Sequence, residues 1–311
     1  MPVASPLATR LAASPLALRL GDPAAGDFSL LRSVTGGTVV GTIASHADGN
    51  DFVVRKQLTG TRTEDFRLEL GTAMSGGLLD WIAASWEAKP PRRDGAVLAC
   101  DATYTVRSER PFTSALVSET AFPAFDAGSK EPAFLAIRIV PQALPPATDP
   151  GTKLPFAASP GAKQKLWLSA NFRLAIDGLD CTKVSRIAPF AVRRPVERVS
   201  SGGGRGSDIR AGRIDFPSLR IRLSAAAAAS WKAWFDDFVL KGNNSDAAER
   251  KGSLTLLAPN LADELIRIDF AGLGIFRLTG DPDPDASPAA IATMTAELYC
   301  EQMTLVPGGA P

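Results

Sequence analysis

One stretch of this chain occurs twice. Residues Phe66 to Trp86 align without gaps onto Leu219 to Val239, at an offset of 153 residues in a chain of 311. The alignment places Trp81 on Trp234, and four of the five tryptophans of the chain lie in the two copies. Because the offset is nearly half of the chain, the duplication predicts two tandem domains rather than a solenoid of short repeats.

Both copies predict the same local elements. Alternating apolar residues at 66–70 and 219–223 predict a strand with one buried face. Large side chains spaced by three and four residues predict a helix of about three turns behind each strand. We interpret Trp81 and Trp234 as core anchors, because a buried aromatic contributes on the order of 1.5–3 kcal/mol. The predicted inner faces are Leu78, Trp81, Ile82 and Ser85, and Trp231, Trp234, Phe235 and Phe238.

The segments that follow the helices also correspond. A basic turn with a glycine opens the next strand in each half, and we expect Gly95 and Gly252 to supply a positive φ there. Each half then ends in a strand, an exposed loop and a last alternating strand. Residues 141–165 contain six prolines and two glycines and predict a semi-rigid connector outside the core. The predicted organisation is a first domain at 1–145, a Pro-rich linker at 146–165 and a second domain at 166–311.

Composition excludes several classes of protein. A net charge of +1 gives no overall field for nucleic acid or anionic membranes, and no apolar run is long enough to span a membrane. The N-terminal 20 residues lack the continuous apolar region of a signal peptide and predict a flexible leader before the first strand. Three widely separated cysteines predict neither disulfides nor a metal site. The small basic clusters at 90–95 and 192–198 predict salt bridges at a rim rather than a nucleic-acid surface.

Catalysis has little support in the sequence. His46 is the single histidine and sits among small residues, and no nucleophile elbow or metalloprotease motif is present. The acidic segment 280–287 resembles the start of a calcium loop, but Ala286 and Ala292 stand where that loop requires glycine and glutamate. We therefore predict no enzyme activity, no catalytic residues, no cofactor and no metal.

The glycine-rich segment at 200–208 lacks the lysine of a phosphate-binding loop. Two interpretations stay open: a plain flexible loop, and a loop that becomes ordered when subunits stack. Trp86 lies beside the helix stripe and is either a further packing residue or a contact to a neighbouring subunit. The candidate stacking residues are Ser201, Gly202, Gly203, Gly204, Arg205 and Gly206.

The motifs of both halves resemble those of the contractile-tail tube protein family of myophages and extracellular contractile injection systems. Residues 172–178 resemble its opening strand, 184–187 the turn after it and 78–82 its helix. Residues 118–140 of this chain, "SETAFPAFDAGSKEPAFLAIRIV", resemble the closing segment of the family. The matching positions are Phe122, Pro123, Phe125, Asp126, Ser129 and Glu131. The start of the first half and the end of the second half depart from the pattern.

The resemblance implies a mainly β fold: two tandem antiparallel β-sandwich or barrel domains of tail-tube type, each with one short α-helix. It also implies a structural protein that assembles with itself, with three two-domain chains closing a pseudo-sixfold ring and rings stacking into a tube. Implied partners are sheath and baseplate or spike proteins, with DNA or protein as cargo in the lumen and no membrane. Assembly would occur in the cytoplasm, before incorporation into a virion or phage-tail-like particle.

Two alternatives stay open at this point. A baseplate hub or tube-initiating ring would share the two-domain trimer but would not polymerise along its axis. A monomeric β-sandwich binding module would need an exposed aromatic platform, for which Tyr104, Tyr299 and the predicted buried tryptophans are poor candidates.

Overall fold

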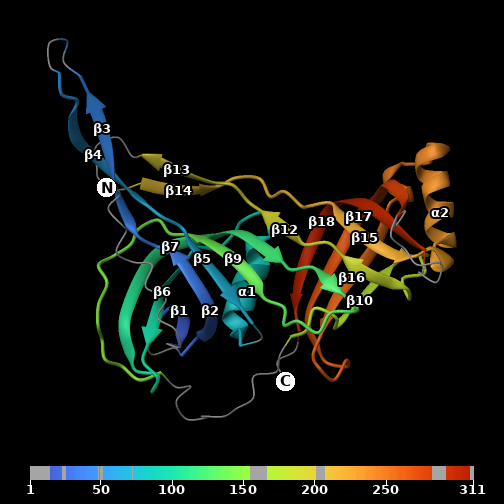
Figure 1. The fold of residues 1–311 in the computed structure, drawn as a ribbon, viewed down its shortest axis with the longest axis horizontal. Coiled ribbons are helices and arrows are strands. Elements are labelled where there is room, and N and C mark those ends of the chain that lie inside the picture. Colours follow the sequence, from blue (N-terminus) through green and yellow to red (C-terminus); the bar gives the residue numbers. More distant parts are fainter. Residues whose placement is uncertain are drawn as a thin grey trace.

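The computed structural model describes residues 15–22, 26–47, 49, 52–71, 73–154, 167–200, 207–281 and 292–308. These residues form a mainly β structure with two short helical segments, arranged as two units side by side (Figure 1). The elements of the first half are β1 (Leu16–Leu20), β2 (Phe28–Gly36), β3 (Val39–His46), β4 (Arg55–Thr63), β5 (Phe66–Leu70), α1 (Gly76–Ser85), β6 (Arg93–Cys100), β7 (Val106–Phe122), β8 (Phe125–Asp126) and β9 (Leu135–Val140).

The second half begins with β10 (Phe172–Ile176), and its helical part is α2 (Ala229–Phe235) continued by a π-helical turn (Asp236–Leu240). Two short 3-10 turns lie at Ala225–Ala227 and Asp246–Ala248. The other strands are β11 (Val184–Ile187), β12 (Phe190–Arg193), β13 (Val196–Ser200), β14 (Ser207–Ala211), β15 (Leu219–Ser224), β16 (Arg250–Leu257), β17 (Glu264–Asp281) and β18 (Thr293–Pro307).

The first half is a closed barrel, and the second is an open, curled sheet. Strands β7, β6, β1, β2, β5 and β9 are hydrogen-bonded in that order, and β9 pairs back onto β7. In the second half the order is β10, β16, β17, β18, β15 and β11, but β10 and β11 do not pair. The fold therefore agrees with the predicted pair of β-barrel-like units, one of which is left open at a single junction.

The offset of 153 residues extends further back than the sequence comparison indicated. Strand β2 meets β5 at Val34 and Leu68, and β11 meets β15 at Ile187 and Ile221. Both pairings then contain a register shift at the same place. The shifts lie between Leu31 and Ser33 and between Val184 and Arg186.

The second pair of corresponding registers lies at the last strands of each half. Strand β7 pairs with β9 at Glu119 and Arg138, and β17 pairs with β18 at Arg277 and Glu297. Each long strand has one extra residue immediately before this pair, Ser118 in β7 and Phe276 in β17. Shared β-bulges are specific features of a backbone, so the two halves follow one strand plan.

Two strand pairings cross between the halves. Strand β12 adds to the end of β7, with Phe190 opposite Phe122, and β8 adds to β11, with Phe125 opposite Ile187. Phe125 is fully buried and lies against Phe172 and Phe190. The expected exposed loop follows at residues 127–132, most of which are exposed, but Phe125 just before it packs into the other half of the chain.

The helices pack as their spacing predicts. In α1 the buried residues are Leu78, Trp81, Ile82 and Ser85, and the side chain of Ser75 caps the first turn by accepting from the N–H of Leu78. In α2 and its π-helical continuation the buried residues are Trp231, Trp234 and Phe238, whereas Phe235 is half-buried.

The two glycines after the helices have a different role from the predicted one. Gly95 and Gly252 lie inside β6 and β16, and neither has a positive φ. A Cβ at Gly95 would stand 2.4 Å from the backbone oxygen of Arg19, and a Cβ at Gly252 would stand 2.6 Å from that of Ala175. Glycine is present because a neighbouring backbone approaches closely, as at other strand glycines.

Part of the Pro-rich connector contacts the core. Thr148 and Lys153 form isolated bridges with Glu109 and Thr105 of the first half. Leu154 is 4% exposed and packs with a small apolar cluster of the barrel. Residues 146–154 are thus bound to the first barrel, whereas 155–166 lie outside the described residues, and the domain limits at 145 and 166 stay a prediction.

Candidate assembly surface

Each half carries a β-hairpin between its second and third barrel strands. The hairpins are β3–β4 in the first half and β13–β14 in the second, and they correspond in register: Ile43 faces Leu58, and Val196 faces Ala211, at the offset of 153. Their surroundings differ. The β13–β14 hairpin lies over the first barrel, whereas β3–β4 projects away from the rest of the molecule (Figure 1).

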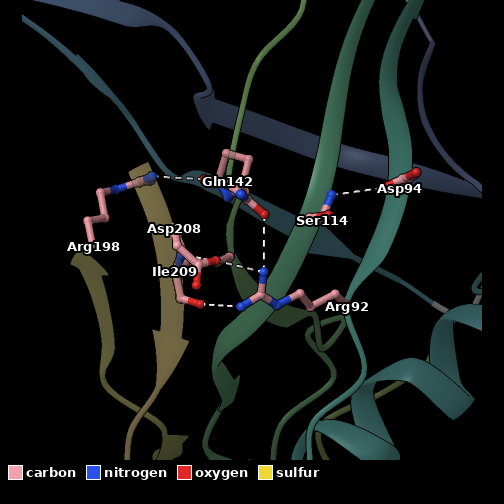
Figure 2. A network of polar contacts seen from close by, with 8 residues as sticks. Arg92, Asp94, Ser114, Gln142, Arg198, Asp208 and Ile209 are labelled. Carbon is pink, nitrogen blue, oxygen red and sulfur yellow. Dashed lines mark hydrogen bonds and ion pairs between the residues drawn. The ribbon is translucent and has the colours of Figure 1, made fainter. Parts of the chain in front are cut away.

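Polar contacts fix the β13–β14 hairpin to the first barrel. The guanidinium of Arg92 donates to the carboxylate of Asp208 at 2.9 Å, to the carbonyl of Ile209 at 2.5 Å and to the side-chain oxygen of Gln142 at 3.1 Å (Figure 2). The hydrogen bond from Arg92 holds the pKa of Asp208 below its usual value. Two contacts to β14 from one planar guanidinium, itself held by Gln142, fix the position of this strand more sharply than a single ion pair does.

A second arginine holds the other strand of the hairpin. Arg198 of β13 pairs with Asp65 at 3.1 Å and donates to the carbonyl of Pro141 at 2.9 Å. Asp65 also pairs with Arg138 of β9 at 2.7 Å. The prediction that the small basic clusters form salt bridges is therefore confirmed for Arg92 and Arg198.

Apolar packing accompanies these contacts. Ile209 of β14 is fully buried against Leu116 and Val140 of the barrel, with Val196 and Ala211 beside it. Before the hairpin, β12 continues the sheet of β7. The hairpin of the second half is therefore held by strand pairing, apolar burial and ion pairs together.

Trp86 completes the contact between the halves. Its ring is 7% exposed and lies edge-on to Phe122 of the first half at 6.2 Å and to Phe216 of the second at 6.3 Å. The structure thus places Trp86 between the two halves of one chain, rather than on a surface facing a separate subunit.

An open cavity of about 670 Å³ lies next to Trp86, between α1 and β18. On its wall, the buried guanidinium of Arg194 donates to the backbone carbonyls of Gly212 and Glu87. Burial lowers the pKa of Arg194. The bond to Glu87 joins the second half to the chain just after α1, whereas the buried Nε of Arg194 has no partner among the described residues.

The β3–β4 hairpin presents apolar side chains to solvent. Phe52 is 100% exposed, Ile43 63% and Leu58 64%. Val39, Val53 and Val54 on the same hairpin are also more than half exposed. Ile43 and Leu58 face each other across the two strands, and exposed apolar side chains gathered on one projecting element are a mark of an interaction site. Sequence reasoning missed this hairpin, because residues 39–63 share no motif with 192–216 and only the strand registers make the two hairpins correspond.

The predicted site residues lie in two different places. Trp81 is fully buried, and its indole N–H donates to the carbonyl of Pro91 at 3.0 Å. Trp234 is 4% exposed, and the guanidinium of Arg250 lies 4.8 Å from its ring centroid. The candidate stacking residues Ser201, Gly202, Gly203, Gly204, Arg205 and Gly206 lie outside the described residues, between the ends of β13 and β14.

The described residues also bear on metal binding and on membrane insertion. Over the part of the chain that the structure describes, no group of three or more histidine, cysteine, aspartate or glutamate side chains is placed to hold a metal ion. No helix among those residues is long and apolar enough to cross a membrane. His46 is the end of β3 in the projecting hairpin, opposite Arg55.

The solved structures that are similar to this chain include components of contractile injection systems. No protein-family model matches it, and no curated protein does. A protein of the PVC sheath–tube complex in the extended state is similar in structure, with a TM-score of 0.38 and 16% identity over 46% of this chain and 94% of that one. The tube-terminating cap of the anti-feeding prophage gives a TM-score of 0.34 and 14% identity, over 43% and 88%. Hcp1 from Flavobacterium johnsoniae gives 0.25 and 12%, over 43% and 95%.

Proposed function

We propose that this chain is a structural, self-assembling ring or tube component of a contractile phage tail or phage-tail-like injection particle. The observation that carries the proposal is the contact between its own halves. A barrel unit binds the strand and hairpin of the unit next to it, through β12 on β7 and β13–β14 over the first barrel. A second hairpin, β3–β4, carries exposed apolar side chains and projects from the same molecule.

The proposal treats the chain as two fused copies of a ring-forming unit. Three chains would supply six units, and closed rotational symmetry is the common outcome of a head-to-tail contact that repeats. The working surfaces are then strand edges and apolar side chains, with no catalytic set. Sheath, baseplate or spike proteins and a luminal cargo would be the other partners, after assembly in the cytoplasm.

A hub or tube-initiating ring is the second candidate. The difference between the halves favours it, because a closed barrel and an open sheet alternating around a ring give two kinds of lateral neighbour and two kinds of axial surface. A uniform tube would be served equally well by six identical units.

Light scattering and electron microscopy of the purified chain test both candidates. We expect particles of three copies of the 32.7 kDa chain, seen as rings in class averages. Axial stacks would favour the tube role, and single rings the hub role. A strictly monomeric chain at high concentration, without rings or stacks, would contradict the proposal.

A further inference from the structure

We propose that the β3–β4 hairpin of one copy binds the free edge of β17 in a second copy, in the way that β12 and the β13–β14 hairpin bind the first barrel within the chain. The inference rests on the proposed self-assembly and identifies the surfaces that would carry it. It starts from the register shared by the two halves.

The contact within the chain defines what each partner must present. On the donor side, residues 190–193 form β12 and lead into the hairpin. On the acceptor side, Glu119–Phe122 of β7 pair with these residues, and the carbonyl of the bulge residue Ser118 accepts a hydrogen bond from the N–H of Arg194 at 2.8 Å. The first half thus binds the second half through the carbonyl of Ser118 and the strand edge at Glu119–Phe122.

Both partners have counterparts elsewhere in the chain. At the offset of 153, residues 37–40 correspond to β12 and lead into the β3–β4 hairpin. The registers of β7–β9 and β17–β18 make Phe276 the counterpart of Ser118, and Arg277–Gly280 the counterpart of Glu119–Phe122. Among the described residues, no strand pairs with the outer edge of β17 at 277–280.

Exposed apolar side chains gather on these two counterpart surfaces. On the hairpin, Val39, Ile43 and Leu58 correspond to Val192, Val196 and Ala211, which are buried or half-buried against the first barrel. Beside the β17 edge, Phe276 is 46% exposed, and Val239 and Leu240 are also exposed. Val239 corresponds to Trp86, the residue that packs between the halves. Of the large hydrophobic side chains that are exposed in the described residues, all but Leu261 lie on one of these two surfaces.

The counterparts of the Arg92–Asp208 ion pair also have opposite charges, with the acidic and basic positions exchanged. Asp208, which pairs with Arg92 within the chain, has Arg55 as its counterpart at the offset of 153. Arg92 has Glu249 as its counterpart, since the β6–β7 and β16–β17 registers match at Arg93 and Arg250. The contact between copies would thus set Arg55 against Glu249; both side chains also interact within the chain, and Glu249 accepts a hydrogen bond from the Tyr299 hydroxyl at 2.7 Å. The pair formed by Arg198 and Asp65 is not repeated, because Ser45 and Ser218 stand at those positions.

A contact of this kind is heterologous, with an arm on one copy and an edge on the next. In Figure 1 the β3–β4 hairpin lies at one end of the long axis, and α2, whose π-helical end carries Val239 and Leu240, lies at the other. An arm and an edge at opposite ends bind head to tail, which produces a ring when the rotation closes. A second copy of this chain is therefore the partner that the surface fits.

Aspartate substitutions test the two surfaces separately. Leu58→Asp places a charge on the arm, and Phe276→Asp places one at the edge. We expect each to weaken association by on the order of tenfold or more, measured as the mass in multi-angle light scattering over a dilution series. Leu261→Asp is the matched control, because Leu261 is 56% exposed and lies on neither surface, and it should assemble as the unsubstituted chain does.

Mixing the two variants gives the sharper result. In the mixture, Phe276→Asp keeps an intact arm and Leu58→Asp keeps an intact edge. These two surfaces can bind each other once, so the mixture should give particles of two copies and no rings. As a second measurement, Arg55→Glu and Glu249→Arg should each weaken association, and the double variant should recover it. Circular dichroism of each variant identifies any that fails to fold, and the charge-swap set then carries the test.

The outcomes separate this interface from the proposed function. If the unsubstituted chain is monomeric, self-assembly itself is wrong, and this interface falls with it. If the chain forms rings and both aspartate variants form them equally well, the rings are built through other surfaces, and only this inference is overturned. The interface would be supported if two-copy particles form in the mixture but not in either variant by itself, and if the double charge-swap variant recovers association.

Discussion

Replacing Ile209 with alanine should detach the β13–β14 hairpin from the first barrel without unfolding either half. Ile209 is fully buried, and its apolar partners Leu116 and Val140 belong to the barrel, so its side chain joins two elements that are distant in sequence. Ile209→Ala removes three carbons, worth about 2.4 kcal/mol at about 0.8 kcal/mol for each buried methylene. Measured costs for such truncations run from about 2 to 5 kcal/mol.

The lower part of that range applies here. The small cluster lies between a two-stranded hairpin and the barrel surface, so water can fill the space and little empty cavity remains. A loss of about 2–3 kcal/mol in the opening free energy corresponds to roughly 30- to 150-fold faster amide exchange in β13 and β14, at about 1.4 kcal/mol for each factor of ten. Hydrogen exchange followed by mass spectrometry measures this, with peptides of β16 and β17 as an internal reference.

Ile43→Ala is the matched control, because Ile43 occupies the projecting hairpin and is 63% exposed. In the monomer it should change stability by less than about 0.5 kcal/mol. The reasoning is refuted if exchange in β13 and β14 is unchanged by Ile209→Ala. Equal acceleration across the whole chain would also refute it, because the hairpin would then not be a separately held element.

Three further outcomes follow from single features. Gly95→Ala should destabilise the first barrel by about 1–3 kcal/mol in chemical denaturation, because its Cβ would stand 2.4 Å from a backbone oxygen of β1; Gly60→Ala, with nothing within 4 Å, should be close to neutral. The pKa of Asp208 is lower in the folded chain than in the unfolded chain, so its ionised form stabilises the folded state above the usual carboxyl pKa. This stabilisation is lost as the pH falls through the folded-state pKa. An NMR titration of Asp208 should therefore give a midpoint below about 3.9, and Arg92→Gln should raise that midpoint. Burial raises the pKa of the Cys300 thiol to about 11, so at pH 8.5 iodoacetamide should label it far more slowly in the native than in the unfolded chain; equal rates would contradict this.

Sequence reasoning succeeded where local pattern decides structure. The helix faces around Trp81 and Trp231 follow from spacings of three and four residues, which one side of a helix must bury. The alternation at 66–70 and 219–223 likewise predicted β5 and β15 with the correct inward residues. The mainly β, two-unit fold could be predicted because the same elements recur in the same order.

It failed where one backbone meets another. The role of Gly95 depends on a carbonyl oxygen of β1, far away in sequence, and no property of the glycine turn itself indicates that approach. Phe125 reads as part of a loop, but its burial depends on aromatic residues of the other half. The place of Trp86 between the halves is decided in the same way.

The amino-acid sequence by itself indicated the repeat, because residues 66–86 and 219–239 match at one offset whether or not the chain is folded. Only the tertiary structure decided what the two copies do differently. One barrel closes and the other stays open between β10 and β11, and one hairpin is held by Arg92, Arg198 and Ile209 while its counterpart projects with Ile43 and Leu58 exposed. The physical reason is that a strand edge exposes the same backbone groups in both copies, so its pairing depends on which neighbour the folded chain brings to it. The hairpins also differ in sequence, because Ser45 and Lys56 stand where the held hairpin has Arg198 and Ile209.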